Sequence, residues 1–253
     1  MSTSSITISW IAFGFVFGGA VLGASLRTAL PEPHLSSESK EAVRVAMGLV
    51  ATMVALVLGS LTASAKSSYD TQNGELTEMS SKLVLLDRVL AHYGPESKEA
   101  RDEVRNSGIR FLDQMELKDP TGASQLEPPT TDSEILYDKV QELSPKDDAQ
   151  RSTRSQALNM VIALGQTRWL MYEQRINSVS MPLLVTLIFW LTALFASFGL
   201  FAPRNPTVFL TLVVSALSVS GAILLILEMY APYAGLIRLS DTPLRAALAH
   251  LGR

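Results

Sequence analysis

Four stretches of this chain run for at least 21 residues without a charged side chain: residues 6–26, 45–65, 176–203 and 205–227. The hydrocarbon core of a bilayer is about 30 Å thick, so a helix that rises about 1.5 Å per residue needs roughly 20 apolar residues to cross it. Each stretch is long enough, and none shows the alternating pattern of a transmembrane β-barrel strand. Because a segment in lipid must satisfy its own backbone hydrogen bonds, the sequence predicts four membrane-spanning helices.

The first stretch has to be distinguished from a cleaved signal sequence. Such a signal has a basic N-terminal region followed by an apolar run of about 7–15 residues. Here residues 1–5 contain no Lys or Arg, and the apolar run of residues 6–26 is longer. We therefore expect a retained transmembrane helix.

Charged side chains are concentrated in the middle of the chain. Apolar residues make up 47% of the sequence and charged residues 18%, and residues 66–178 hold 14 Lys and Arg and 19 Asp and Glu. Because neither this region nor the remainder is strongly basic, we expect no nucleic-acid partner. Cysteine is absent, which excludes a disulfide framework, a thiolate nucleophile and a zinc–sulfur site.

Together these features predict an all-α integral membrane protein, with a helical cytoplasmic bundle inserted between the second and third transmembrane helices. Residues 1–66 are expected to hold transmembrane helices 1 and 2, and residues 67–175 the helical cytoplasmic domain. Residues 176–228 are expected to hold transmembrane helices 3 and 4, and residues 229–253 form a cytoplasmic tail.

The second transmembrane helix is expected to continue out of the membrane as one helix from about Lys40 to Tyr93. No proline occurs between Pro33 and Pro95. Beyond the membrane, apolar residues repeat at alternating spacings of 3 and 4, which is typical of a helix that buries one face. Gly94 and Pro95 then match the end of one helix and the start of the next. The buried row is predicted to be Leu76, Met79, Leu83, Leu86, Leu90 and Tyr93.

Three further helices are expected in the middle region: one over about 95–117, a short one after a capping box at Thr131 to Glu134, and a last one from Ser144 and Pro145. A linker rich in proline and glycine separates the first two. The last helix is expected to lead straight into the third transmembrane stretch, which would give a second continuous rod antiparallel to the first.

Lys and Arg near the ends of the four stretches predict the orientation in the membrane. Seven lie on the side of the middle region and of both termini, and four lie on the opposite side, so we expect both termini and the middle region in the cytoplasm. The seven are Lys66, Lys82, Arg168, Arg175, Arg238, Arg245 and Arg253, and the four are Arg27, Lys40, Arg44 and Arg204.

The residues give no indication of an enzyme. His34, His92 and His250 lie in three separate regions without the paired spacing of a metal site, and the sequence has no glycine-rich phosphate loop or nucleophile elbow. Carboxylates within 96–116 alternate with Lys and Arg at helical spacing, which is typical of an exposed, salt-bridged face. We therefore expect no catalytic residue, no metal and no cofactor.

Four glycines on neighbouring positions of the first stretch predict close helix packing. In lipid no hydrophobic force drives helices together, so close backbone approach through glycine is a common source of association. Packing within one subunit and packing between subunits both fit this pattern. The residues are Gly14, Gly18, Gly19 and Gly23.

A row of small residues follows one face of the second stretch, and Lys66 adds a cation at its cytoplasmic end. One interpretation is a groove for helix packing with an ordinary interfacial lysine, which Asp70 could neutralise. The other is a pore-lining helix, in which small residues leave room for an ion and lysines from several subunits attract anions. The candidate pore-lining residues are Gly48, Thr52, Ala55, Gly59, Ala63 and Lys66.

The fourth stretch ends in an acidic residue, Glu228. A carboxylate at membrane depth is costly unless it reaches the interface or a partner. The neighbouring Tyr230 and Tyr233 favour the interface, Arg238 is a candidate partner, and a role in conduction is the alternative. A short helix is expected near Asp241, with Leu244, Ala247, Leu248 and Leu251 facing inward. The tail motif consists of Glu228, Pro232, Gly235 and Arg238.

Two segments resemble the bestrophin-like family of bacterial membrane proteins, usually described as a domain of unknown function. One is LVLGSLTASAKSSYDTQNGELTEMSSKLVLLDRVLAHYGPE, and the other is the fourth stretch with Pro232-Tyr233-Ala234-Gly235 and the tail 239–248. Bestrophins proper are pentameric chloride channels whose second transmembrane helix lines the pore. The resemblance therefore implies a multi-pass protein of the bacterial inner membrane, a homo-oligomer, pentameric by analogy, and chloride or another small anion as the permeant species. No acidic calcium-binding cluster is apparent, so calcium gating is not implied.

Three functional hypotheses follow. The first is an oligomeric anion channel with the second transmembrane helix at its axis. The second is a non-conducting, membrane-anchored scaffold or signalling protein that acts through its cytoplasmic helices. The third, a transporter or membrane enzyme, is disfavoured because intramembrane charges, broken spans and catalytic motifs are not apparent. Membrane lipid is a partner in all three.

Overall fold

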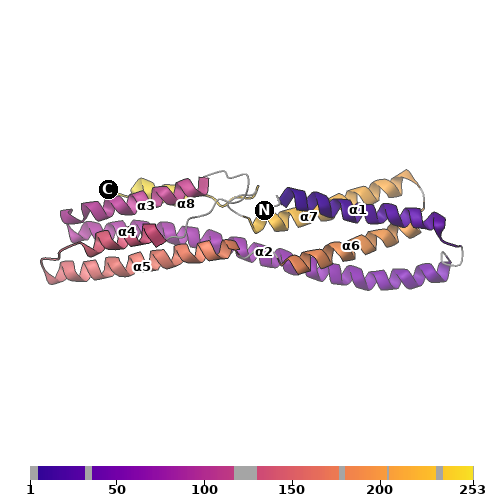
Figure 1. Ribbon diagram of the computed structural model, residues 1–253, viewed down its shortest axis with the longest axis horizontal. Coiled ribbons are helices and arrows are strands. Elements are labelled where there is room, and N and C mark those ends of the chain that lie inside the picture. Colours follow the sequence, from indigo (N-terminus) through magenta and orange to yellow (C-terminus); the bar gives the residue numbers. More distant parts are fainter. Residues whose placement is uncertain are drawn as a thin grey trace. The chain divides into compact units, whose positions relative to one another are not determined.

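The structure is a computed structural model that describes residues 5–31, 36–116, 130–176, 180–203, 205–231 and 236–252. Within these ranges the chain is helical and has no strand, as predicted. Between α2 and α3 lies a single 3₁₀ turn, Pro95–Ser97. The α-helices (Figure 1) are α1 (Ser5–Ala29), α2 (Ser37–Tyr93), α3 (Lys98–Glu116), α4 (Thr130–Gln141), α5 (Asp148–Ile176), α6 (Met181–Phe201), α7 (Pro206–Met229) and α8 (Thr242–His250).

Four of these helices, α1, α2, α6 and α7, are long and apolar enough to cross a membrane. They coincide with the four uncharged stretches, so the prediction of four candidate spans is confirmed. The helix α2 continues for 57 residues without interruption, as the absence of proline between its ends predicted. Its last residue is followed by Gly94 at φ 126°, a conformation that favours glycine, and then by Pro95.

The chain divides into two compact units. The first, here called the membrane unit, comprises residues 3–68 and 179–230 and contains α1, α6, α7 and the first part of α2. The second, here called the polar unit, comprises residues 1–2, 69–178 and 231–253. The tail from residue 231 onwards is thus grouped in the same unit as the middle helices.

In the membrane unit, the backbones of α1 and α6 approach each other closely at glycine residues on both helices. A Cβ atom placed on Gly19 would lie 2.6 Å from the carbonyl oxygen of Thr192, and one on Gly23 would lie 1.9 Å from that of Ala196. From the other side, a Cβ on Gly199 of α6 would lie 1.9 Å from the carbonyl oxygen of Ala20. Side chains larger than hydrogen do not fit at these positions, so glycine sets the distance between the two helices.

In the polar unit, the predicted apolar row of α2 is buried, from Leu76 at 0% exposure to Tyr93 at 2%. It packs in one core with Val104 and Phe111 of α3, Leu136 and Val140 of α4, and Val161 and Met171 of α5. The short helix α8 joins this core through Leu244 and Leu251, and Ala247 is also buried, as the sequence predicted for the tail.

One prediction about the fold is wrong. The last helix of the middle region does not run into the third span, because α5 ends at Ile176 and α6 begins at Met181, with Ser180 in a non-helical conformation (φ −59°, ψ 97°). Pro182 lies in the first turn of α6. Proline lacks an amide hydrogen and is accommodated in a first turn but not in a helix interior, so a helix that contains Pro182 has to start close to it.

Tyr93 offers a first test of the packing in the polar unit. Its hydroxyl is buried and has no hydrogen-bond partner among the described residues. A buried polar group without a partner is destabilising, so we expect Tyr93→Phe to leave the stability of the polar unit unchanged or to raise it by about 1 kcal/mol. Thermal unfolding followed by circular dichroism measures this, and a loss of stability would show that the hydroxyl is hydrogen-bonded in the protein.

Candidate functional site

The six candidate pore-lining residues all lie on α2 with their side chains exposed on the surface of the single chain. At Gly48 and Gly59, no described atom outside the local helix lies within 4 Å of the position that a Cβ atom would occupy. The row therefore does not form a packing groove within the described part of the chain.

The face of α2 that packs within the chain is a different one. Val54, Leu61 and Ala65 are buried there and belong to the core of the membrane unit, together with α6 and α7. Even so, only 11% of the apolar window of α2 is buried, compared with 28–33% for the other three candidate spans. The second span thus leaves more of its surface uncovered than any of its neighbours.

A second row on α2, made of large apolar residues, was not predicted. Val45, Leu49, Met53 and Leu56 are large, apolar and exposed, with exposures of 47–72%. At about 100° per residue, this row lies roughly a quarter turn from the row of small residues. Its spacing of 4, 4 and 3 was present in the sequence, but only the structure shows that the chain's own helices leave it bare.

The hydroxyl groups along α2 are partly engaged. Thr52 Oγ1 donates to the carbonyl oxygen of Gly48 at 3.0 Å, and Thr62 Oγ1 donates to that of Leu58 at 2.8 Å. Tyr230 OH donates to Ser64 Oγ at 2.9 Å. A hydroxyl that donates to the backbone offers only its oxygen to an ion, and an oxygen acceptor does not stabilise an anion. Thr52 and Thr62 therefore do not form an anion-coordinating shell in this arrangement.

The glycines of α1 divide into two pairs. Gly19 and Gly23 contact the backbone of α6, as described above, whereas no described atom outside the local helix lies within 4 Å of a Cβ position on Gly14 or Gly18. Only half of the predicted packing motif is thus used inside this chain. The partner glycine in α6, Gly199, was not predicted, although Ala196 and Gly199 form a small-residue pair in the sequence.

Within the tail motif, Glu228 is buried at 4% exposure in the membrane unit, and its predicted place at the membrane interface stays a prediction. Arg238 belongs to the polar unit, where its carbonyl oxygen accepts a hydrogen bond from Tyr69 OH at 3.2 Å. Pro232 and Gly235 lie outside the described residues. The structure thus brings the tail onto α2 through Tyr69.

The polar unit carries the salt-bridged surface that its sequence predicted. Arg110 pairs with Glu103 at 2.6 Å, and Lys146 pairs with Glu96. The hydrogen bond from Lys146 lowers the pKa of Glu96, and the same bond raises the pKa of Lys146. Among the described residues, no group of three or more His, Asp or Glu side chains is placed to hold a metal ion.

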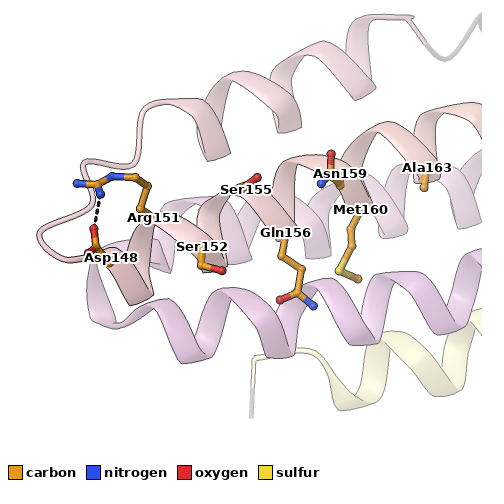
Figure 2. Close-up of a pocket in the computed structure, with 8 residues that line it drawn as sticks. All are labelled: Asp148, Arg151, Ser152, Ser155, Gln156, Asn159, Met160 and Ala163. Carbon is orange, nitrogen blue, oxygen red and sulfur yellow. Dashed lines mark hydrogen bonds and ion pairs between the residues drawn. The ribbon is translucent and has the colours of Figure 1, made fainter.

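One surface of the polar unit is neither apolar nor strongly charged. A hollow of about 700 Å³ lies along α5 and is lined at one end by the Asp148–Arg151 pair. Figure 2 shows that small and uncharged polar side chains follow along the same helix face. They are Ser152, Ser155, Gln156 and Asn159, followed by Met160 and Ala163.

Within its described residues the chain is helical, and four apolar helices are long enough to span a bilayer, which is compatible with a multi-pass membrane protein. The chain matches the Bestrophin-like domain over residues 14–244, and it therefore belongs to the Bestrophin-like family. This confirms the resemblance drawn from the sequence. No curated protein and no solved structure gives a significant match to the chain.

Proposed function

We propose that this protein is an oligomeric anion channel in which α2 lines the pore. The observation that carries the proposal is the row of small residues on α2, all of which are exposed on the single chain, with no described atom outside the local helix within 4 Å of a Cβ position on Gly48 or Gly59. Chloride or another small anion is the proposed permeant species. By analogy with the bestrophins, the assembly is a pentamer in a bacterial inner membrane, with both termini and the polar unit in the cytoplasm.

A ring of subunits accounts for both uncovered faces of α2. Large apolar side chains suit a contact between subunits, where they gain dispersion energy and exclude lipid. We assign this role to the row that contains Leu49 and Leu56. The adjacent row of small residues then faces the axis, where it leaves space for a hydrated ion.

The charges of the assembly favour anions at one end of this path. Lys66 follows directly after the uncharged stretch 45–65, so copies from all subunits form a ring of positive charge at the pore mouth. Such a ring raises the local anion concentration and excludes cations. Because Thr52 and Thr62 donate to the backbone, we propose that the anion passes this region with most of its water. No enzymatic role is proposed.

Chloride efflux from liposomes tests the proposal. Liposomes that contain the full chain should release chloride faster than empty ones, and Ala55→Trp should reduce the flux about tenfold or more because indole rings from every subunit fill the axis. The matched control is Leu217→Trp on α7, which is also exposed but lies outside α2, and its flux should equal that of the wild type. Particle images should show a closed ring with α2 innermost.

Folded, monodisperse protein without chloride flux would contradict the channel, as would equal flux in the Ala55→Trp variant and in the wild type. A monomer in particle images would contradict the ring. Lys66→Glu separates pore architecture from selectivity, since it should lower the chloride-to-cation permeability ratio several-fold while the ring stays intact.

The hollow on α5 supports a second candidate function, a membrane-anchored scaffold. Uncharged polar side chains such as Gln156 and Asn159 are exposed on an otherwise charged surface, and such a surface suits contact with another protein better than an exposed salt-bridged face does. A photo-crosslinking residue at Asn159 in the full chain distinguishes the candidates. Crosslinks to a different protein together with absent flux favour the scaffold.

A further inference from the structure

A cavity of about 570 Å³ lies within the membrane unit, between the first turns of α2, the last turns of α6 and the first turns of α7. This volume is in the range of small-ligand sites in proteins, about 300–1,000 Å³. The lining divides into two kinds of surface. Lys40 and Arg44 form a basic part, and apolar side chains that include Met47, Phe198 and Leu212 form the rest.

The two parts lie at different depths relative to the span. Lys40 and Arg44 immediately precede the uncharged stretch 45–65, so in a bilayer they lie at the level of the lipid headgroups. Met47 and Ala51, which also line the cavity, lie one and two turns further into the hydrocarbon. The cavity is therefore basic where a lipid is polar and apolar where a lipid is apolar.

The cavity follows the face of α2 that packs against its own chain. The spacing of Lys40, Arg44, Met47 and Ala51 continues into Val54, which is buried in the core of the membrane unit. Gly48 borders both the cavity and the candidate pore row. At this end of the span, the chain's own helices leave part of that face uncovered.

The cations of the cavity are available for a ligand. Within the described ranges, neither Lys40 nor Arg44 forms a side-chain hydrogen bond or an ion pair, and the nearby Glu38 and Glu41 do not line the cavity. Arg27 at the same end is different, because it donates to the carbonyl oxygen of Ala202. That contact serves the packing of α1 against the α6 terminus, so Arg27 is not part of the proposed site.

We propose that this cavity binds one anionic phospholipid per subunit. The phosphate group would lie against Lys40 and Arg44, since guanidinium and ammonium groups are the usual protein donors to phosphate. One acyl chain would fill the apolar part beside Met47 and Phe198. A zwitterionic lipid carries no net charge and would gain much less from the two cations.

The site gives a physical reason for basic residues on the side that the orientation proposal places outside the cytoplasm, where Lys and Arg are otherwise disfavoured. A bound lipid would also fill the space that the chain's own helices leave between α2 and α6. A lipid that binds only the folded protein stabilises it by mass action. The inference does not depend on conduction and holds equally for a channel or a scaffold.

Native mass spectrometry of the full chain in mild detergent, with added phosphatidylglycerol or phosphatidylcholine, tests the site. Phosphatidylglycerol should bind at one copy per subunit and raise the unfolding temperature, and phosphatidylcholine should do neither at the same concentration. Lys40→Gln/Arg44→Gln should weaken phosphatidylglycerol binding about 30-fold, or roughly fivefold per cation. The matched control, Lys98→Gln/Arg105→Gln, removes two exposed cations from α3 and should bind as the wild type does.

A second variant tests the apolar part and guards against misfolding of the first. Ala51→Phe should weaken phosphatidylglycerol binding while both cations remain. Equal binding of the two lipids, equal loss in the control variant, or unchanged binding in Ala51→Phe would each overturn the proposal. Competition by millimolar glycerol phosphate would also overturn it, because the site would then recognise a free phosphate rather than a lipid.

Discussion

Replacing Gly199 by alanine is expected to lower the free energy of unfolding of the membrane unit by about 3 kcal/mol. The new methyl group would lie 1.9 Å from the carbonyl oxygen of Ala20 and 3.0 Å from the backbone nitrogen of Ala24. Both contacts are with backbone, which cannot rotate away as a side chain can. The helices α1 and α6 would have to separate, and their other contacts would loosen with them.

Gly18→Ala is the matched control, because no described atom outside the local helix lies within 4 Å of the added carbon. Alanine is the better helix former, so this variant should be neutral or more stable by about 0.5–1 kcal/mol. The opposite signs of two glycine-to-alanine changes, measured by thermal unfolding in the same detergent, make the test specific. Equal stabilities would show that α1 and α6 do not approach this closely in the protein.

Gly23→Ala extends this test across the interface. Its added carbon would lie 1.9 Å from the carbonyl oxygen of Ala196, so it separates the same two helices as Gly199→Ala. Once one substitution has moved them apart, the second should cost less than it does alone. The double variant is therefore expected to be less destabilised than the sum of the single variants, a coupling that only neighbouring sites show.

The features that the sequence predicted well are those that one helix expresses by itself. The row from Leu76 to Tyr93 follows from helical periodicity, and the end of α2 follows from the conformations that Gly94 and Pro95 favour. The lengths of the four candidate spans follow from the thickness of the hydrocarbon core of a bilayer. Each of these features depends on local geometry or on the solvent, so each can be predicted without knowing which helix packs against it.

Features that depend on contacts between helices were not predictable in the same way. The sequence shows small residues in both α1 and α6 but not that Gly23 and Gly199 meet. Nor does it show that the guanidinium of Arg168 lies 5.4 Å from the ring centre of Phe111 and donates to Ser107. Arg168 is thus part of the packing of the polar unit.

The choice between the faces of α2 is of the same kind. Periodicity identified the small-residue row, but only packing shows that Val54 and Leu61 face the chain's own core and that Leu49 and Leu56 do not. At its N-terminal end, the face of α2 that packs against its own chain carries Lys40 and Arg44 and borders a cavity. In the proposals above, this cavity takes a lipid, and the two exposed rows face a neighbouring subunit and the pore axis.

Replacing Arg101 by alanine is expected to lower the free energy of unfolding of the polar unit by about 4 kcal/mol. Arg101 binds Asp87 through Nε at 2.7 Å and Nη2 at 3.0 Å, and the backbone nitrogen of Gly252 donates to the same carboxylate at 3.3 Å. The Asp87 side chain is only 2% exposed. Without Arg101, a buried carboxylate would remain with one weak donor, which is the costly way to break a buried pair.

The two single variants should differ in stability, because the charged side chain that remains is more exposed in one than in the other. Asp87→Ala leaves a guanidinium that is 23% exposed and therefore partly hydrated, so it should cost less, about 2–3 kcal/mol. The hydrogen bonds to Asp87 raise the pKa of the Arg101 guanidinium. While Asp87 is ionised, this part of the stabilisation is present below the ordinary arginine pKa and is lost as the pH rises through the raised pKa of Arg101.

The double variant, Asp87→Ala/Arg101→Ala, distinguishes the cost of an unpaired buried charge from the simple loss of contacts. If the unpaired Asp87 carboxylate causes most of the destabilisation, adding Asp87→Ala to Arg101→Ala should raise the free energy of unfolding by about 1–2 kcal/mol, because no buried charge remains. Hydrogen exchange should show faster opening of α8 in all three variants, since Gly252 loses its acceptor or its acceptor is repositioned. Asp113→Ala, an exposed aspartate of α3, is the control and should stay within about 0.5 kcal/mol of the wild type. A double variant less stable than Arg101→Ala would contradict this account of the pair.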